Sequence, residues 1–323
     1  MKVCVLGCGA YGSALSIILS ENGNEVVGWT AFEEEAKSLT ETRIPKKLPD
    51  VVLPNDIKFT SDLKEATKDA SFVLVAVPTA FVRETLRKAK DYIKDTPVCV
   101  ASKGIEQDTC LFVSDIVENI LDTDNIAVFS GPSFAIDVAN KVPVGLTLAC
   151  QNKETTDLIT KAFCNDHFKL RLCSDIIGTE ICGAIKNVIA IASGILNGMG
   201  MPESTIAMFI TESVHDIKEL IKGLGGDGDT ISSFAGFGDL LLTATSPKSR
   251  NYSFGYLIGK GASKEEIDEY IKNTTIEGLY TLKSVRDLID GKNVDMPIIE
   301  LINEIIYGNK KPEDLVKFLI EKP

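Results

Sequence analysis

The sequence is poor in the residues that build metal sites and disulfide frameworks. It has only two histidines, His167 and His215, and its eight cysteines are scattered with no CxxC pair among them. Structural zinc sites gather four Cys or His ligands, and long chains with scattered cysteines are typical of reducing compartments. We therefore expect no metal site, reduced cysteines and a cytoplasmic protein.

A basic surface and a long apolar run are also missing. The 34 Lys and Arg are outnumbered by 46 Asp and Glu, giving a net charge of −12, so no long-range positive field attracts nucleic acid or an anionic membrane. No uninterrupted apolar run reaches the roughly 18–20 residues of a membrane span, and the apolar run at the N-terminus is too short for a signal peptide. We expect no nucleic-acid partner and no integral membrane segment. An anionic substrate must then be held by a few local cations.

The residues that are present fit two domains. The chain has 323 residues, 44% of them hydrophobic, and domains usually hold roughly 100–200 residues. Strand and helix patterns alternate up to about residue 175, and helical patterns follow. We predict an α/β fold, with a Rossmann-type dinucleotide-binding domain over 1–175 and an all-helical substrate-binding domain over 176–323.

A Gly-x-Gly-x-x-Gly motif follows the first predicted strand, residues 2–6, and leads through a helical pattern to a second strand over 25–29. This context is typical of dinucleotide binding. Gly7 allows a tight turn, Gly9 lets the backbone approach a pyrophosphate, and Gly12 lets the helix, whose N-terminus faces the phosphates, pack closely. The alternative is a glycine turn without a ligand. The predicted cofactor-binding residues are Gly7, Gly9, Ala10, Tyr11 and Gly12.

The motif lacks its usual acid at the tip of the second strand, where a carboxylate binds the ribose 2′-hydroxyl. Trp29 to Phe32 stand there, and acids appear only from Glu33 to Glu35. No arginine lies between Trp29 and Thr42 to meet the 2′-phosphate of NADP, and the acidic run would repel it. We favour NAD as the cofactor, with NADP possible. Glu34 and Glu35 are equally well explained as the solvated first turn of a helix.

Three more buried strands are predicted, over residues 72–77, 98–101 and 126–129. In an open parallel sheet, ligands bind beyond the carboxyl ends of the strands, so the segments after these strands line one crevice. Lys103 follows a strand directly and is expected to face the ligand; the alternative is an exposed loop lysine. Phe81 packs either on the cofactor or on the following helix, and Ser133 is a candidate substrate contact.

The second half carries a polar cluster inside an apolar pattern. Residues 180–192 are apolar on nearly all faces and predict a buried helix, with Lys186 and Asn187 in its middle. A buried ammonium needs a carboxylate, a ligand or a lowered pKa, and a desolvated lysine can trade a proton. Asp239 supplies such a carboxylate and shares a helix face with Thr243. The alternative is a lysine that reaches solvent from the helix edge.

Arg250 and Asn251 are expected in a turn after a helix, where they form a plausible phosphate grip, because guanidinium binds phosphate through two hydrogen bonds. The alternative for Arg250 is an ordinary surface residue.

Together these segments resemble the NAD-dependent glycerol-3-phosphate dehydrogenase family, over roughly residues 2–310. The lysine-asparagine helix and the segment from GDLLLT to SRN are the specific signals. The matching segments, in order, are GCGAYG at 7–12, VAVPTAF at 75–81, SKG at 102–104, SGPSFA at 130–135, EICGAIKNVIA at 180–190, GFGDLLLT at 236–243, SRNYSFG at 249–255 and IEG at 276–278.

The resemblance implies an oxidoreductase of glycerophospholipid metabolism that interconverts dihydroxyacetone phosphate and sn-glycerol 3-phosphate by hydride transfer with a nicotinamide cofactor. It implies a homodimer with the active site between the two domains. It assigns catalysis to Lys103, Lys186 and Asp239. It assigns the substrate and its phosphate to Asn187, Thr243, Arg250 and Asn251. It assigns the cofactor to Gly7, Gly9, Gly12, Phe81 and Glu277.

Residues 197–212 depart from the family's pattern, at Asn197, Pro202, Ser204, Ile206 and Glu212. Two alternatives therefore stay open. One is a related Rossmann dehydrogenase acting on another small phosphorylated or carboxylated keto or hydroxy compound. The other is a non-catalytic dinucleotide-sensing protein, against which Lys103, Lys186 and Asp239 argue, because a binding module has no need of paired buried lysines.

Overall fold

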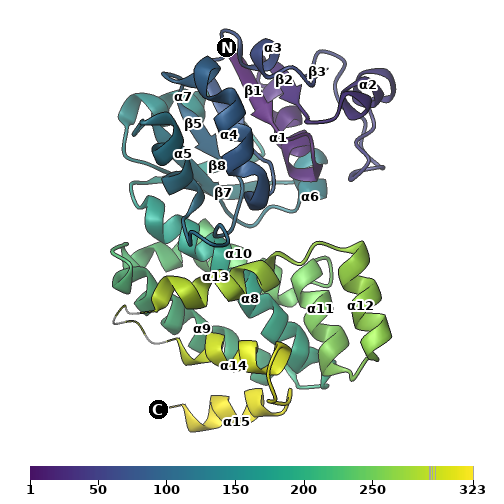
Figure 1. Cartoon of the computed structure of the whole chain (residues 1–323), viewed down its shortest axis with the longest axis vertical. Helices are drawn as coiled ribbons and strands as arrows, with labels where there is room; N and C mark the ends of the chain where they lie inside the picture. The colour runs from purple at the N-terminus through teal and green to yellow at the C-terminus, as the bar shows by residue number, and fades with distance from the viewer. Residues whose placement is uncertain (291, 293, 295, 323) are drawn as a thin grey trace. The chain divides into compact units, whose positions relative to one another are not determined.

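A computed structural model of the chain describes residues 1–290, 292, 294 and 296–322. The chain divides into two compact units (Figure 1). The first holds residues 1–103 and 112–176, and the second holds residues 104–111 and 177–323. The short segment that follows Lys103 therefore belongs to the helical unit, although strands of the first unit flank it in the sequence.

A sheet of eight strands within the described residues forms the first unit, in the order β3-β2-β1-β4-β5-β6-β7-β8. Neighbouring strands are parallel except β6 and β7, which pair antiparallel. The predicted strand over 72–77 ends at Val75, because Ala76 and Val77 pass against the turn at Gly7. The strands are β1 Lys2–Leu6, β2 Glu25–Trp29, β3 Lys58–Thr60, β4 Phe72–Val75, β5 Val98–Val100, β6 Ile126–Ser130, β7 Val144–Cys150 and β8 Phe168–Cys173.

Helices cover both faces of this sheet (Figure 1). Helix α1 packs against α6 and α7, whereas α4 packs against α3 and α5. This is the doubly wound arrangement, in which crossover helices leave the strands buried on both sides. The helices of the first unit are α1 Ala10–Glu21, α2 Glu33–Thr42, α3 Leu63–Thr67, α4 Thr79–Ile93, α5 Val113–Leu121, α6 Ala135–Ala139 and α7 Lys153–Phe163.

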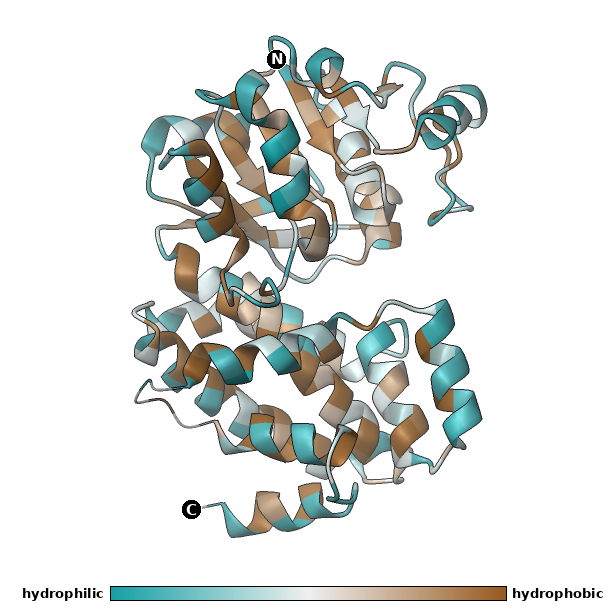
Figure 2. Cartoon of the chain, viewed as in Figure 1, coloured by the Kyte–Doolittle hydropathy of each residue, from teal (hydrophilic) through white to brown (hydrophobic). Residues whose placement is uncertain are grey.

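The core of the first unit is apolar along the central strands, which are predominantly brown in Figure 2. Strands β4, β5 and β6 are buried throughout. Phe129 and Phe163 meet edge to face with ring centroids 4.8 Å apart, and Phe168 stacks on Phe163 at 5.5 Å. Burial of these large rings stabilises the part of the sheet that contains β6 and β8.

The second unit is helical, as the pattern after residue 175 predicts. Its helices are α8 Ile176–Gly198, α9 Glu203–Gly223, α10 Asp239–Thr245, α11 Arg250–Gly259, α12 Lys264–Asn273, α13 Glu277–Ile289, α14 Pro297–Ile306 and α15 Asp314–Glu321, with a 3-10 helix over Gly228–Ser232 and a π-helix over Phe234–Gly238.

Helix α8 is the core helix of the second unit. Among the described residues it is the one helix long and apolar enough to cross a membrane, but 89% of its most apolar window is buried inside the protein. A Cβ on Gly194 would lie 2.0 Å from the carbonyl oxygen of Tyr252, and a Cβ on Gly255 would lie 1.9 Å from that of Ile191. Helices α8 and α11 therefore touch backbone to backbone, which only glycine permits at these positions.

Candidate active site

The glycine turn leaves open backbone in front of α1. Gly7 has a φ of +109°, a conformation that favours glycine, and its N–H donates to the carbonyl oxygen of Trp29 at 2.9 Å. A Cβ on Gly12 would lie 1.9 Å from the carbonyl oxygen of Gly7, whereas a Cβ on Gly9 meets no heavy atom within 4 Å among the described residues. Gly9 is also the N-cap of α1 and has no side chain to cover the first amides. The turn therefore fits a bound pyrophosphate.

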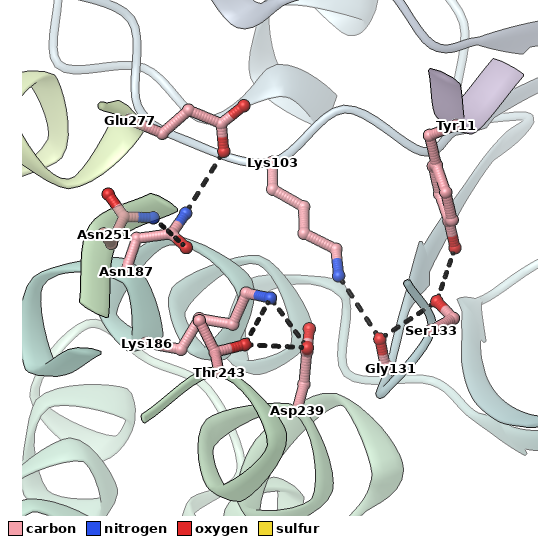
Figure 3. A network of polar contacts seen from close by, with 10 residues as sticks. All are labelled: Tyr11, Lys103, Gly131, Ser133, Lys186, Asn187, Asp239, Thr243, Asn251 and Glu277. Atoms are coloured by element: carbon pink, nitrogen blue, oxygen red, sulfur yellow. Dashed lines mark hydrogen bonds and ion pairs between the residues drawn. The ribbon is translucent and has the colours of Figure 1, made fainter. Parts of the chain in front are cut away.

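Two of the predicted residues of the first unit contact one carbonyl oxygen, that of Gly131, just beyond β6, and a third, Tyr11, contacts one of the two (Figure 3). The Nζ of Lys103 lies 3.4 Å from this oxygen, and the hydroxyl of Ser133 donates to it at 3.2 Å. The hydroxyl of Tyr11 in turn lies 2.9 Å from that of Ser133. This set joins the first turn of α1 to the ends of β5 and β6.

The loop that carries Lys103 is fixed by its neighbours. The hydroxyl of Thr79, at the start of α4, donates to the main-chain oxygen of Lys103 at 2.9 Å. Lys103 itself is half-buried. Phe81 lies in the first turn of α4 and is 57% exposed, so its ring is available to a ligand and contributes little to the core.

Lys186 lies in the middle of α8 with only 8% of its surface exposed, which rules out the alternative of a lysine reaching solvent. Its Nζ donates to Oδ1 of Asp239 at 2.7 Å and to the hydroxyl of Thr243 at 3.1 Å (Figure 3). Asp239 is 2% exposed. Because a buried charge is costly unless it is paired and hydrogen-bonded, the ammonium and the carboxylate each offset the cost of burying the other.

A break in the helical backbone brings Asp239 to this position. The π-helix over Phe234–Gly238 contains Gly236 with a ψ of −106°, outside the helical region. A Cβ on Gly236 would lie 2.1 Å from the carbonyl oxygen of Ile231, so the segment folds tightly on itself. Asp239 then begins α10, and Thr243 follows one turn later on the same face.

A second polar set joins α8, α11 and α13 through carboxamides. The Nδ2 of Asn251 donates to Oδ1 of Asn187 at 3.0 Å, and the Nδ2 of Asn187 lies 3.3 Å from Oε2 of Glu277. The Oδ1 of Asn251 accepts the N–H of Gly278 at 2.8 Å. Asn251 thus uses both ends of its carboxamide within the protein, and Glu277 is tied to the residue that follows Lys186.

Arg250 and Asn251 open α11, so the prediction that they lie in a turn is wrong. Ser249 is the N-cap and accepts the N–H of Tyr252 with its side chain. Arg250 is exposed, and its main-chain oxygen accepts the hydroxyl of Tyr270 at 3.2 Å. Arg250 is therefore an exposed residue at a helix N-terminus, where an anion is stabilised by the helix dipole.

The atypical stretch 197–212 spans the end of α8 and the first half of α9. Glu212 accepts from the Nζ of Lys322 at 3.0 Å, and Asp216 accepts from the same ammonium at 2.6 Å. Glu212, where the sequence departs from the family's pattern, therefore forms an ion pair with Lys322 in the C-terminal segment. Asn197, Pro202 and Ser204 are exposed.

Main-chain groups are the functional candidates that the sequence did not reveal. The carbonyl oxygen of Gly131 and the N–H of Gly278 both hold site residues, and both lie inside segments that carry the resemblance. A side-chain motif cannot show which backbone atom is used, since every residue offers the same groups. Within the described residues, no group of three or more His, Cys, Asp or Glu is arranged to hold a metal ion.

Two family models match the chain. The model described as the NAD-dependent glycerol-3-phosphate dehydrogenase N-terminus matches residues 2–156, and the model of the corresponding C-terminus matches residues 175–317. The chain is 38% identical to glycerol-3-phosphate dehydrogenases from Lactobacillus delbrueckii subsp. bulgaricus and Bacillus subtilis, whose names give NAD(P)+ as the cofactor. Those alignments cover 99% of this chain and 96% and 94% of the relatives.

A solved structure agrees with these relationships. The crystal structure of a glycerol-3-phosphate dehydrogenase from Coxiella burnetii matches this fold with a TM-score of 0.92 at 29% identity, and the match covers 99% of both chains.

Proposed function

The chain belongs to the NAD-dependent glycerol-3-phosphate dehydrogenase family, and from this premise we propose that it interconverts dihydroxyacetone phosphate and sn-glycerol 3-phosphate. It is an NAD(P)-dependent oxidoreductase. When bound, a nicotinamide cofactor would supply or accept the hydride. The observation that carries the proposal is the buried ion pair of Lys186 and Asp239, because reduction of a carbonyl needs a proton donor held in place.

Lys186 is the proposed general acid in the direction of reduction. Its Nζ gives a proton to the developing alkoxide oxygen at the central carbon and takes one back in the reverse direction. Asp239 and Thr243 hold the amine in one position through the bonds of 2.7 and 3.1 Å. A positioned acid or base of this kind contributes roughly 10²–10⁴-fold to a rate.

Lys103 has a proposed electrostatic role. Its ammonium, held near the carbonyl oxygen of Gly131, adds positive charge near the substrate oxygen as negative charge develops there. Ser133 shares that carbonyl oxygen and is proposed to contact the substrate beside it.

Arg250 is the proposed phosphate ligand, since its exposed guanidinium can bind phosphate through two hydrogen bonds. For Asn251 the contacts support a positioning role, because its carboxamide already joins Asn187 to the N–H of Gly278. Asn187, set in this way, is proposed to contact the substrate, and Glu277 to contact the cofactor.

The proposed cofactor site consists of the glycine turn, the first turn of α1 and the exposed ring of Phe81. The pyrophosphate would bind over Gly9, in front of the α1 amides. We further propose that the chain works as a homodimer in the cytoplasm, as the family resemblance implies.

Steady-state oxidation of NADH tests the function. The substrates are dihydroxyacetone phosphate, unphosphorylated dihydroxyacetone and a small 2-keto acid. We expect kcat/KM for dihydroxyacetone phosphate to exceed that for dihydroxyacetone by at least about 10²-fold, because losing the phosphate leaves the cation unpaired. A higher kcat/KM for the keto acid would instead identify a related dehydrogenase. Absence of turnover with intact NADH binding would favour the dinucleotide sensor.

A further inference from the structure

The tip of β2 is the place where a Rossmann domain meets the adenosine ribose. Trp29 ends the strand, and Thr30, Ala31 and Phe32 follow without an acid. Ala31 is exposed, and Phe32 is 70% exposed. The group that recognises the ribose must therefore come from elsewhere in the chain.

Glu35, in the first turn of α2, is folded back onto this tip. The hydroxyl of Thr30 donates to its carboxylate, and Thr30 is only 4% exposed, so the contact is sheltered from water. The neighbouring acids differ: Glu33 and Glu34 are exposed, whereas Glu35 is half-buried. One acid of the run is thus held against the sheet, and the other two are solvated.

The tip of β2, against which Glu35 is held, is bonded to the glycine turn. The carbonyl oxygen of Trp29, one residue before Thr30, accepts both the N–H of Gly7 at 2.9 Å and the thiol of Cys8 at 3.4 Å. Burial, and after it the nearby charge of Glu35, raise the pKa of the Cys8 thiol. The strand tip that holds Glu35 is therefore hydrogen-bonded to the turn that is proposed to bind the pyrophosphate.

Cations near this tip are either occupied or exposed. The guanidinium of Arg43 donates to the carbonyl oxygen of Ile57 at 2.6 Å and stands 5.8 Å over the ring of Phe59. Lys37 and Lys64 are exposed, where a charge interaction is weak. Glu33, Glu34, Asp62 and Glu65 are exposed in the same way, so Glu35 is the half-buried acid at this tip.

We propose that Glu35 binds the adenosine ribose 2′-hydroxyl and repels a 2′-phosphate, so that the chain uses NADH in preference to NADPH. The inference rests on the proposed function and specifies its cofactor. The ribose 2′-hydroxyl would donate to Oε1 of Glu35, because Oε2 already accepts the hydroxyl of Thr30. A phosphate in the same place would put two negative charges together with no cation fixed between them, and this repulsion disfavours NADPH.

The test compares Glu35→Gln with a matched control, Glu34→Gln. Both remove one charge from the same helical turn, but Glu34 is solvated. The measurement is kcat/KM for NADH and for NADPH with dihydroxyacetone phosphate at one fixed ionic strength. We expect the wild type to favour NADH at least about tenfold, Glu35→Gln to reduce that ratio at least about tenfold through KM, and Glu34→Gln to change it less than about twofold.

Direct titration of NADH and NADPH by fluorescence separates this proposal from the proposed function, because it needs no turnover. If the protein binds both cofactors equally, or if Glu35→Gln leaves the ratio of dissociation constants unchanged, the role of Glu35 is wrong. An equal change in Glu34→Gln would also overturn it, since the effect would then come from net charge. Thr30→Val serves as a second variant that keeps the charge but frees the carboxylate, and it should reduce the ratio by a smaller factor.

Discussion

The two units differ in the atoms that build their candidate sites. In the first unit, the site is formed mainly by backbone atoms. The glycine turn offers main-chain amides, and the carbonyl oxygen of Gly131 contacts Lys103 and Ser133. In the second unit, buried side chains bond to one another, with Lys186 between Asp239 and Thr243.

The two lysines of the candidate site illustrate this difference. Lys103 is half-buried, with its Nζ 3.4 Å from the carbonyl oxygen of Gly131, whereas Lys186 is buried against the carboxylate of Asp239. A half-buried ammonium keeps part of its contact with water, while an ion pair in a water-poor site fixes both groups. We therefore expect the second unit to carry the proton transfer and the first to carry cofactor binding.

Removing Lys186 should have the largest effect on turnover. Lys186→Ala is expected to lower kcat by about 10²–10⁴-fold while the dissociation constant of NADH stays within about twofold. A variant that keeps more than about a tenth of kcat would contradict the proton-donor role. Because Asp239 would be left buried without its partner, which typically costs about 3–5 kcal/mol, the pair Lys186→Met with Asp239→Leu serves as the folded, inactive control.

Two glycine substitutions test the backbone-built site. Gly12→Ala is expected to abolish NADH binding and to lower the free energy of unfolding by about 1–3 kcal/mol, because its Cβ would lie 1.9 Å from a carbonyl oxygen. Gly9→Ala should fold like the wild type, since its Cβ meets open space, yet weaken NADH binding at least about tenfold by occupying the place of the pyrophosphate. Thermal unfolding and NADH titration measure the two effects. Wild-type affinity in Gly9→Ala would show that no phosphate approaches this turn.

Lys103→Ala is expected to have an intermediate effect. Loss of one electrostatic donor near the reacting oxygen costs roughly 10²-fold in kcat, with little change in stability because Lys103 is only half-buried. The measurement is kcat with dihydroxyacetone phosphate beside the thermal midpoint. An unchanged kcat would make Lys103 an ordinary loop lysine.

The cluster of Lys322 with Asp216 and Glu212 should affect stability but not kcat. Burial works against the charged form of Lys322, but its hydrogen bonds to Asp216 and Glu212 outweigh burial and raise its pKa above the ordinary 10.5. Its stabilising contribution is therefore complete below pH 10.5 and is lost as the pH rises through the raised value. Lys322→Met should lower the free energy of unfolding by about 1–3 kcal/mol at neutral pH, and the deficit should shrink in strongly alkaline solution.

Lys317→Met is the matched control for that measurement, because Lys317 pairs with Asp314 three residues away on the exposed face of α15. An exposed pair is worth about 0–1 kcal/mol. Equal losses in the two variants, or a loss of kcat in either, would contradict the purely structural role assigned to Lys322.

Local patterns in the sequence were sufficient for the fold class and for the glycine turn. Strand, turn and helix are adjacent there, and each glycine answers a local demand on the backbone. The buried helix with Lys186 could also be predicted, since a long run that is apolar on all faces has no solvent-facing side. The start of α11 at Arg250 was missed, because an N-cap serine followed by a polar pair also suits a turn.

The amino-acid sequence by itself determined the doubly wound unit, the helical unit and the set of polar residues available to the site. Only the tertiary structure decided which of these residues meet: Lys186 with Asp239, Asn251 with Gly278, and Glu35 with Thr30. The first two contacts join segments far apart in the chain, and all three depend on how elements pack. Sequence spacing reports neighbours along one strand or helix, whereas these contacts follow from the burial of apolar faces that brings separate elements together.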